Sequence, residues 1–172
     1  MREIKFRGKA KMSIEELDDL YLEHENGWVY GHLVMYGKTP YIVGDFIEVD
    51  SEYTVNEFWV PVYPESVGQF TGLTDKNFKE IYEGDILLLH QFLFDGHEFE
   101  NELIGEVVYD QETCSFALRN IRNADVKKYM GYKEHEDCGN IPIFNFYGLH
   151  EESFEKLGDI YENPELLEGG FK

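Results

Sequence analysis

Apolar and polar residues alternate in short runs along most of the chain, and glycine, proline and other turn-forming residues interrupt these runs. The first run, residues 3–7, alternates charged with apolar side chains and predicts a strand that buries one face. Similar runs, which predict further strands, lie at 28–30, 32–36, 41–43, 46–49, 58–60, 67–70, 79–82, 86–89, 103–109, 116–119 and 141–147. Short strands separated by frequent turn signals favour a mainly β fold, either a sandwich or a barrel.

Helical patterns are short and peripheral to the predicted strands. Ser13 precedes Glu16 by three positions, which is the spacing of a capping box at the start of a helix. The apolar residues on one face of that predicted helix are Ile14, Leu17, Leu20 and Tyr21. Residues 151–157 and 164–168 can each support a helical turn. Residues 120–140 are polar and irregular and are predicted to be an insertion, with a short helix around residues 124–129 as the alternative.

A glycine followed by an aspartate and an apolar residue occurs three times, beginning at Gly44, Gly84 and Gly158. Glycine adopts positive φ without strain, and aspartate accepts a hydrogen bond from the backbone two residues on. The pair therefore suits a tight entry into a strand. We predict that these repeats are structural turns, formed in particular by Gly84, Asp85, Gly158 and Asp159.

Charge is both large and unevenly distributed. The net charge is −20, yet residues 1–11 hold five of the fifteen basic side chains and one acid, so they carry +4 and the rest carries −24. A strongly negative field repels phosphate backbones and anionic membrane surfaces. We therefore expect no direct binding of nucleic acid and no membrane association, whereas a basic protein would be attracted.

Cysteine usage and the N-terminus favour a cytoplasmic protein. Cys114 and Cys138 are too few for a disulfide framework and form no Cys-x-x-Cys pair. The basic N-terminus is not followed by the apolar stretch of a secretory signal. No run reaches the ~20 apolar residues of a membrane span.

Patterns that carry chemistry are weak. His135 and Cys138 are three positions apart with two carboxylates between them, but structural zinc sites usually show two close ligand pairs, so an ordinary loop is favoured. The chain has no Gly-x-Ser-x-Gly motif and neither of the common phosphate-binding glycine loops. We therefore predict no catalytic, cofactor-binding or metal-binding residues and no enzymatic activity.

Four blocks of the sequence, taken together, resemble a known family. The blocks are residues 1–8 (MREIKFRG), 27–31 (GWVYG), 67–86 (VGQFTGLTDKNFKEIYEGDI) and 157–167 (LGDIYENPELL). They resemble the YopX family, small proteins encoded by bacteriophages and prophages, mainly of Gram-positive bacteria. The resemblance spans the chain and is thinnest over residues 88–156. It implies one domain over residues 1–172, a partly open SH3-like barrel with short peripheral helices, and no assigned reaction.

The chain departs from the family pattern in two places. The family usually has glycine where this chain has Phe78, at the end of a hairpin turn predicted at residues 75–78. Because asparagine tolerates positive φ, we predict that Asn77 takes the left-handed position and that the hairpin persists. Residues 11–26 are the second departure, a predicted insertion before the Gly-Trp block.

The best candidates for a binding role are two aromatic residues beside prolines. Trp59 and Tyr63 lie next to Pro61 and Pro64, and SH3-like barrels often hold extended peptides with exposed aromatic side chains of this kind. Packing in the core is the alternative role, and large aromatic residues usually serve it.

Three functional hypotheses follow. The leading one is an accessory protein without enzymatic activity that binds another protein or forms a homo-oligomer, because strand edges invite pairing. The second is an acidic decoy that imitates DNA and occupies a host DNA-binding protein, motivated by the −24 charge of residues 12–172. The third is a metal-dependent enzyme, which requires His135 and Cys138 to converge with another ligand around a pocket.

Overall fold

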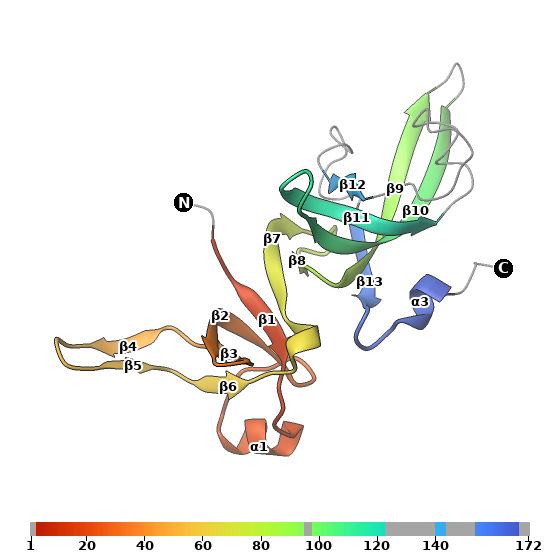
Figure 1. The fold of residues 1–172 in the computed structure, drawn as a ribbon. Coiled ribbons are helices and arrows are strands. Elements are labelled where there is room, and N and C mark those ends of the chain that lie inside the picture. Colours follow the sequence, from red (N-terminus) through yellow and green to blue (C-terminus); the bar gives the residue numbers. More distant parts are fainter. Residues whose placement is uncertain (1–2, 95–97, 123–139, 144–153, 169–172) are drawn as a thin grey trace. The chain divides into compact units, whose positions relative to one another are not determined.

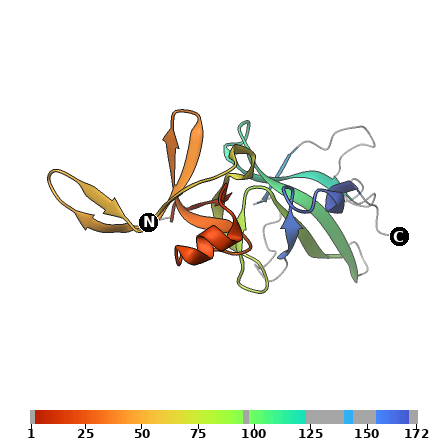
Figure 2. The same ribbon diagram turned by 90° about the horizontal axis from the view of Figure 1, so that it is seen from below.

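The computed structural model describes residues 3–94, 98–122, 140–143 and 154–168. Antiparallel sheets dominate these residues and the helices are short, which confirms the predicted mainly β fold (Figure 1, Figure 2). By its contacts the chain divides into two compact units, residues 1–70 and 71–172, each described by itself. The single domain over residues 1–172 stays a prediction. No described helix is long and apolar enough to cross a membrane.

The first unit is built on an antiparallel sheet in which the strands follow the order β6-β3-β2-β1-β7. The strands are β1 (Phe6–Lys9), β2 (Trp28–Tyr36), β3 (Thr39–Val43), β6 (Trp59–Pro61) and the first residues of β7 (Gly68–Thr74). A 3-10 turn, η1 (Pro64–Ser66), connects β6 to β7. The core of this unit consists of Ala10, Leu17, Val29, Ile42, Val60 and Val62.

The end of β6 returns to the end of β1. Ala10 and Val62 form a single antiparallel bridge, and the N–H of Lys11 donates to the carbonyl oxygen of Pro61 over 2.9 Å. A Cβ atom on Gly8 would lie 2.7 Å from a methyl carbon of Val62, so this close approach requires glycine. The sheet therefore curls back on itself, although none of the described sheets forms a closed barrel.

The helix α1 (Ile14–Asp19) lies within the predicted insertion at 11–26 and begins with the predicted capping box. The Glu16 N–H donates to the Ser13 hydroxyl oxygen, and the Glu16 carboxylate accepts from the Ser13 N–H over 2.8 Å. The bond from the Ser13 N–H lowers the pKa of Glu16. Of the predicted apolar face, Leu17 is buried in the core, and the exposed residues are Ile14, Leu20 and Tyr21.

The second unit contains a five-stranded antiparallel sheet with the order β12-β11-β10-β9-β13. Its strands are β9 (Asp85–Phe94), β10 (Glu98–Asp110), β11 (Ser115–Arg122), β12 (Ile141–Pro142) and β13 (Phe154–Asp159). The later residues of β7 lie next to β8 (Glu80–Tyr82). The buried core consists of Ile81, Leu87, Leu89, Leu103, Val107, Leu118, Ile143 and Phe154.

The C-terminal part of the chain differs from the sequence prediction. The pattern at 151–157 predicts a helical turn, but β13 begins at Phe154, which is opposite Leu89 of β9. Phe154 is buried in the core of the second unit, so packing outweighs a weak local preference for helix. The helical turn predicted at 164–168 is confirmed as α3 (Glu165–Glu168).

Candidate interaction surface

A β-hairpin extends outward between β3 and β6 of the first unit (Figure 1). Residues 44–58 of this hairpin, hereafter the arm, contain β4 (Phe46–Val49) and β5 (Thr54–Asn56). Within the described sheets, β4 and β5 are antiparallel and pair with each other alone. The arm is thus a two-stranded ribbon that continues the β3–β6 pair beyond the sheet.

Hydrogen bonds along the arm fix its register. The Glu57 N–H donates to the carbonyl oxygen of Asp45, and the Asp50 N–H donates to that of Tyr53, each over 2.9 Å. At the tip, the Ser51 hydroxyl donates to Oδ1 of Asp50 over 2.9 Å. This bond, together with that from the Ser51 backbone N–H, lowers the pKa of Asp50. The tip is therefore a defined turn that stays negatively charged in mild acid.

The arm exposes apolar side chains on both of its faces. Five large apolar side chains are between 41% and 67% exposed: Phe46, Ile47, Val49, Tyr53 and Val55. Every residue of β4 is exposed, although successive strand residues point to opposite faces. An isolated two-stranded hairpin is marginally stable in water, and contiguous exposed apolar groups mark interaction sites. We therefore take the arm as the candidate interaction surface.

A β-bulge at the start of β4 contributes to this exposure. The pairing shifts between Phe46, which is opposite Asn56, and Glu48, which is opposite Val55, so Ile47 is the extra residue. A bulge bends its strand and increases the local twist, which re-aims the side chains around it. Phe46 and Ile47 are adjacent in sequence, and both are exposed.

The base of the arm is held to the sheet of the first unit by polar contacts. The Asn56 side-chain amide donates to the carbonyl oxygen of Gly44 over 2.9 Å, and the Gly44 N–H donates to that of Phe58 over 3.1 Å. His32 of β2 lies with Nε2 3.0 Å from Oδ1 of Asp45. The arm is anchored at its base and exposed beyond it.

The arm is also acidic. Residues 45–57 contain five acidic side chains and no lysine or arginine. The five acids, all exposed, are Asp45, Glu48, Asp50, Glu52 and Glu57. Complementary charge selects a partner and speeds its approach, while apolar groups supply most of the contact energy. A surface of this kind suits a partner that offers both apolar and basic groups.

The two aromatic residues predicted to bind peptides lie just beyond the base of the arm. Trp59 and Tyr63 are exposed, while Val60 and Val62 between them are buried, as expected for alternate residues of an extended segment. Trp59 is 54% exposed and packs edge-to-face on Tyr41, with the ring centroids 6.4 Å apart. Neither Trp59 nor Tyr63 belongs to the core, and their binding of a peptide stays a prediction.

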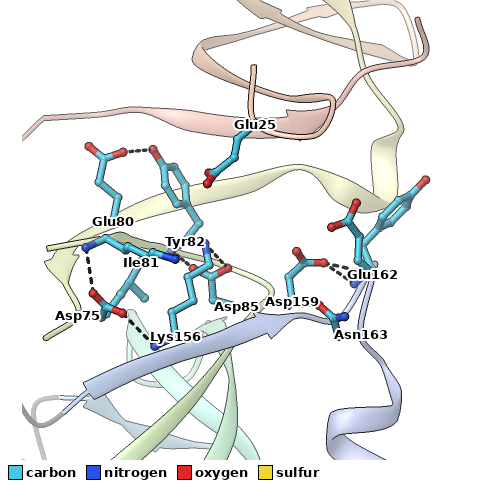
Figure 3. A network of polar contacts seen from close by, with 12 residues as sticks. Glu25, Asp75, Glu80, Ile81, Tyr82, Asp85, Lys156, Asp159, Glu162 and Asn163 are labelled. Atoms are coloured by element: carbon cyan, nitrogen blue, oxygen red, sulfur yellow. Dashed lines mark hydrogen bonds and ion pairs between the residues drawn. The ribbon is translucent and has the colours of Figure 1, made fainter. Parts of the chain in front are cut away.

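A second polar arrangement lies within the second unit (Figure 3). The buried carboxylate of Asp75 accepts from the backbone N–H groups of Asn77 over 2.7 Å, Lys79 over 2.9 Å and Lys156 over 3.2 Å. Burial raises the pKa of Asp75, but the hydrogen bonds from Lys79, Lys156 and Asn77 outweigh it, so the pKa lies below its ordinary value. Asp75 therefore ties the β7–β8 turn to β13.

The predicted structural turns use two more buried aspartates of this network (Figure 3). Oδ2 of Asp85 accepts from the Tyr82 N–H over 2.8 Å, and its Oδ1 lies 3.1 Å from Nζ of Lys156. Oδ1 of Asp159 accepts from the backbone N–H groups of the two turn residues that follow Ile160, each over 2.9 Å. These carboxylates satisfy backbone donors at strand ends, so their arrangement is architectural.

Of the two glycines predicted to form turns, Gly84 lies in a turn and Gly158 lies in a strand. Gly84 has a φ of 81° and donates its N–H to the carbonyl oxygen of Val107 over 2.8 Å. Gly158 lies inside β13, opposite Ile86 of β9. Gly84 therefore occupies the positive-φ turn position expected of it, whereas Gly158 is a strand residue.

The prediction for Asn77 is wrong. Phe78 has the positive φ, 61°, and Asn77 does not. The Phe78 N–H donates to the carbonyl oxygen of Asp75 over 2.9 Å, and the Asn77 N–H donates to the Asp75 side chain. Because Asp75 fixes the turn from its first residue, the left-handed position stays where the family usually has glycine. The hairpin itself persists, as predicted.

A cleft of about 690 Å³ lies beside the base of the arm in the first unit. Its lining includes five carboxylates, from Glu3, Glu23, Glu25, Asp45 and Glu57, together with His24 and His32. Among the described residues, no group of three or more His, Cys, Asp or Glu side chains is placed to hold a metal ion. His135 and Cys138 lie outside the described residues, so their role stays a prediction, as does the absence of catalysis.

Sequence reasoning missed the arm as a unit. It predicts a strand at 46–49 but none at 54–56, and it gives no sign that either strand is exposed. The polar segment 50–52 between two runs of β-branched and aromatic residues is a usable hairpin signal. The exposure of those residues has no such signal, because core and binding strands share the same composition.

Comparison with known proteins places the chain in a family. The YopX protein family matches residues 5–168, nearly the whole chain. The crystal structure of protein EF1440 from Enterococcus faecalis is similar, with 19% sequence identity and a TM-score of 0.46, and the match covers 97% of this chain and 99% of that one. No curated protein matches the chain significantly.

Proposed function

The chain belongs to the YopX family, and we propose that it is a non-enzymatic interaction protein whose arm binds another protein chain. The observation that carries the proposal is the exposure of five large apolar side chains on a ribbon that no other described strand covers. Fully burying a single side chain of this size contributes about 1.5–3 kcal/mol. Covering several of them together therefore offsets part of the free-energy cost of association.

The biological origin of the protein and the compartment in which it acts are a further part of the proposal. We propose an accessory protein of a phage or prophage that acts in the cytoplasm of the host cell, as the family resemblance implies. We also propose that the first unit is a partly open SH3-like barrel. The bridge between Ala10 and Val62 supports it, because it brings β6 back to β1 at the other end of the β1-β2-β3-β6 order.

An acidic decoy of a DNA-binding protein is the second candidate. The observation that favours it is the density of acids on the arm, five exposed carboxylates within residues 45–57. A decoy would bind through charge, so its complex would weaken steeply as salt rises and would tolerate loss of the apolar groups. The apolar interface of the leading proposal would show the opposite behaviour.

A photo-crosslinking amino acid at position 49 tests the leading proposal in the natural host. Val49 is 67% exposed on the arm, and Tyr36, 78% exposed at the end of β2, is the matched position outside it. We expect a covalent adduct with a second polypeptide from position 49 and none from position 36. Adding Phe46→Ser and Ile47→Ser should remove the adduct.

Two outcomes of this experiment contradict the proposal. If position 49 gives no adduct, or if positions 36 and 49 give equal adducts, the arm is not the binding element. A crosslink to a DNA-binding protein that survives Phe46→Ser and Ile47→Ser, and that forms when a host lysate is irradiated at low salt but not at moderate salt, would instead establish the decoy. Circular dichroism of each variant checks that the sheets still form.

A further inference from the structure

Four cations alternate along the N-terminal strand and form what we define as the basic ladder: Lys5, Arg7, Lys9 and Lys11. Alternate residues of a strand share one face. The residues between them belong to the other face, where Phe6 packs on the core and Gly8 approaches Val62. The ladder is therefore a row of positive charge along one face of β1 and its continuation, in which Lys11 is exposed, Lys5 and Lys9 are partly exposed and Arg7 is buried.

Every cation of the ladder lies over an aromatic ring. Measured to the ring centroids, the distances are 5.8 Å for Lys5 over Tyr30, 4.6 Å for Arg7 over Trp28, 5.6 Å for Lys9 over Trp28 and 5.9 Å for Lys11 over Tyr63. Such rings hold cationic groups in place and add apolar area beside them. Lys11 is exposed and Tyr63 is 38% exposed, so this end of the ladder offers both charge and apolar surface.

The ladder and the arm are complementary in charge. Residues 1–11 carry +4, whereas residues 45–57 carry five negative charges and no positive one. Glu48 lies in β4, and Asp50 and Glu52 lie in the turn that follows it, so three of these acids gather at the outer end of the arm. We propose that the arm of one copy of this chain docks on the basic ladder of a second copy, an inference that rests on the proposed function of the arm.

A second copy fits the arm better than two alternatives do. The arm does not use its own ladder, because every residue of β4 is exposed within its own chain. Pairing of two arms with each other would bring ten acidic side chains together without a basic one, which like-charge repulsion opposes. The ladder instead supplies cations, and Tyr63, which lies beside Lys11, supplies an exposed ring for the apolar residues of the arm.

Sedimentation velocity on the full chain, over about a hundredfold range of concentration, measures the association directly. The arm variant is Glu48→Lys with Glu52→Lys, and the ladder variant is Lys5→Glu with Lys11→Glu. The matched controls carry the same charge changes at exposed residues of the described chain: Glu112→Lys with Glu165→Lys, and Lys38→Glu with Lys79→Glu. Circular dichroism and a thermal melt establish that each variant folds.

We expect the wild-type chain to self-associate and both controls to keep that affinity. The arm variant and the ladder variant should each raise the dissociation constant about tenfold or more, since charges facing each other across an interface become alike. Mixing or combining the two variants should restore affinity to within about threefold of wild type, because opposite charges face each other again. Such rescue separates a direct contact from a general effect of net charge.

Three results would overturn the inference. One is a wild-type chain that stays monomeric over the whole range. Another is an association that the controls weaken as much as the arm and ladder variants do, and the third is a failure of rescue in folded variants. If the crosslink at position 49 then captures a different protein, the proposed function of the arm stands and the second copy is excluded. If position 49 captures nothing, both are excluded.

Discussion

The arm of the first unit and the aspartate network of the second unit use acidic residues in opposite ways. In the network, Asp75 and Asp85 are buried, and their oxygens accept from backbone N–H groups or lie against Lys156. In the arm, Glu48 and Glu52 are exposed beside apolar side chains that are also exposed. A carboxylate that is buried with donors stabilises the fold, whereas one left in water is available for a partner.

This contrast separates stability from binding within one chain. Substitutions in the network should lower the free energy of unfolding, because they leave buried groups without partners. Substitutions in the arm should leave the free energy of unfolding almost unchanged and act on association instead. Each of the following changes tests one side of that contrast.

The largest effect is expected for Asp85→Ala. Asp85 is fully buried, and its removal takes the carboxylate from Nζ of Lys156, 3.1 Å away, and an acceptor from the Tyr82 N–H. Breaking a buried ion pair from one side costs about 3–5 kcal/mol. Urea denaturation should show a loss of that size, and Glu112→Ala at an exposed turn is the control, expected to change stability by less than about 0.5 kcal/mol. A loss no larger than that of the control would contradict the network's structural role.

Asp75→Asn should cost less and should make stability less dependent on pH. The pKa of Asp75 is lower in the folded chain, so its charged form adds stability that is complete above the ordinary pKa of about 3.9. That stability is lost as pH falls through the lowered pKa. We expect Asn to cost about 1–2 kcal/mol at pH 7, and the gap to wild type to narrow below pH ~4. Urea denaturation at several pH values measures the difference in stability between Asp75→Asn and wild type. A difference that does not change with pH would disprove the lowered pKa of Asp75.

Phe78→Gly should raise stability. Phe78 has a φ of 61° and is 87% exposed, so glycine relieves backbone strain there without loss of buried surface. The left-handed conformation costs a non-glycine residue about 1–2 kcal/mol, and the greater freedom of glycine in the unfolded chain offsets part of it. A net gain of about 0.5–1 kcal/mol is expected in urea denaturation. Asn77→Gly is the control. A larger gain in stability from Asn77→Gly than from Phe78→Gly would mean that residue 77, and not residue 78, has the strained backbone.

Much of the fold follows from local patterns in the sequence. The capping box of Ser13 and Glu16 and the turn residues before β9 each depend on a few neighbouring residues, and each forms as predicted. The strand predicted at residues 3–7 forms only from Phe6, and its burial does not follow the predicted alternation, because Ile4 is exposed and Arg7 is buried. The errors arise where distant contacts decide. Phe154 starts a strand because the core of the second unit buries it, and Phe78 takes the left-handed position because Asp75 fixes the turn.

The candidate site was less accessible to sequence reasoning. Phe46, Ile47 and Val49 have the composition of a core strand, and nothing local distinguishes them from Val60, which is buried. Whether an apolar strand is covered depends on which other strands reach it, and that is a property of the whole topology. The sequence shows the cations of the basic ladder as a local excess of positive charge. Their contacts with the rings of Trp28 and Tyr30 could not be predicted, because they depend on the pairing of β1 with β2.

The smallest effect on stability is expected in the arm, where one substitution can be compared at two sites of the same unit. Val49 is 67% exposed in β4 and Val60 is 1% exposed in β6. Val60→Ser removes buried methyl groups and buries a hydroxyl, which should cost about 2–3 kcal/mol, whereas Val49→Ser should stay within about 0.5 kcal/mol of wild type. In sedimentation velocity, Val49→Ser should nevertheless weaken association, because the apolar contact is lost. A Val49→Ser chain that is strongly destabilised as a monomer would mean that the arm packs against its own unit, and the separation of binding from stability would fail.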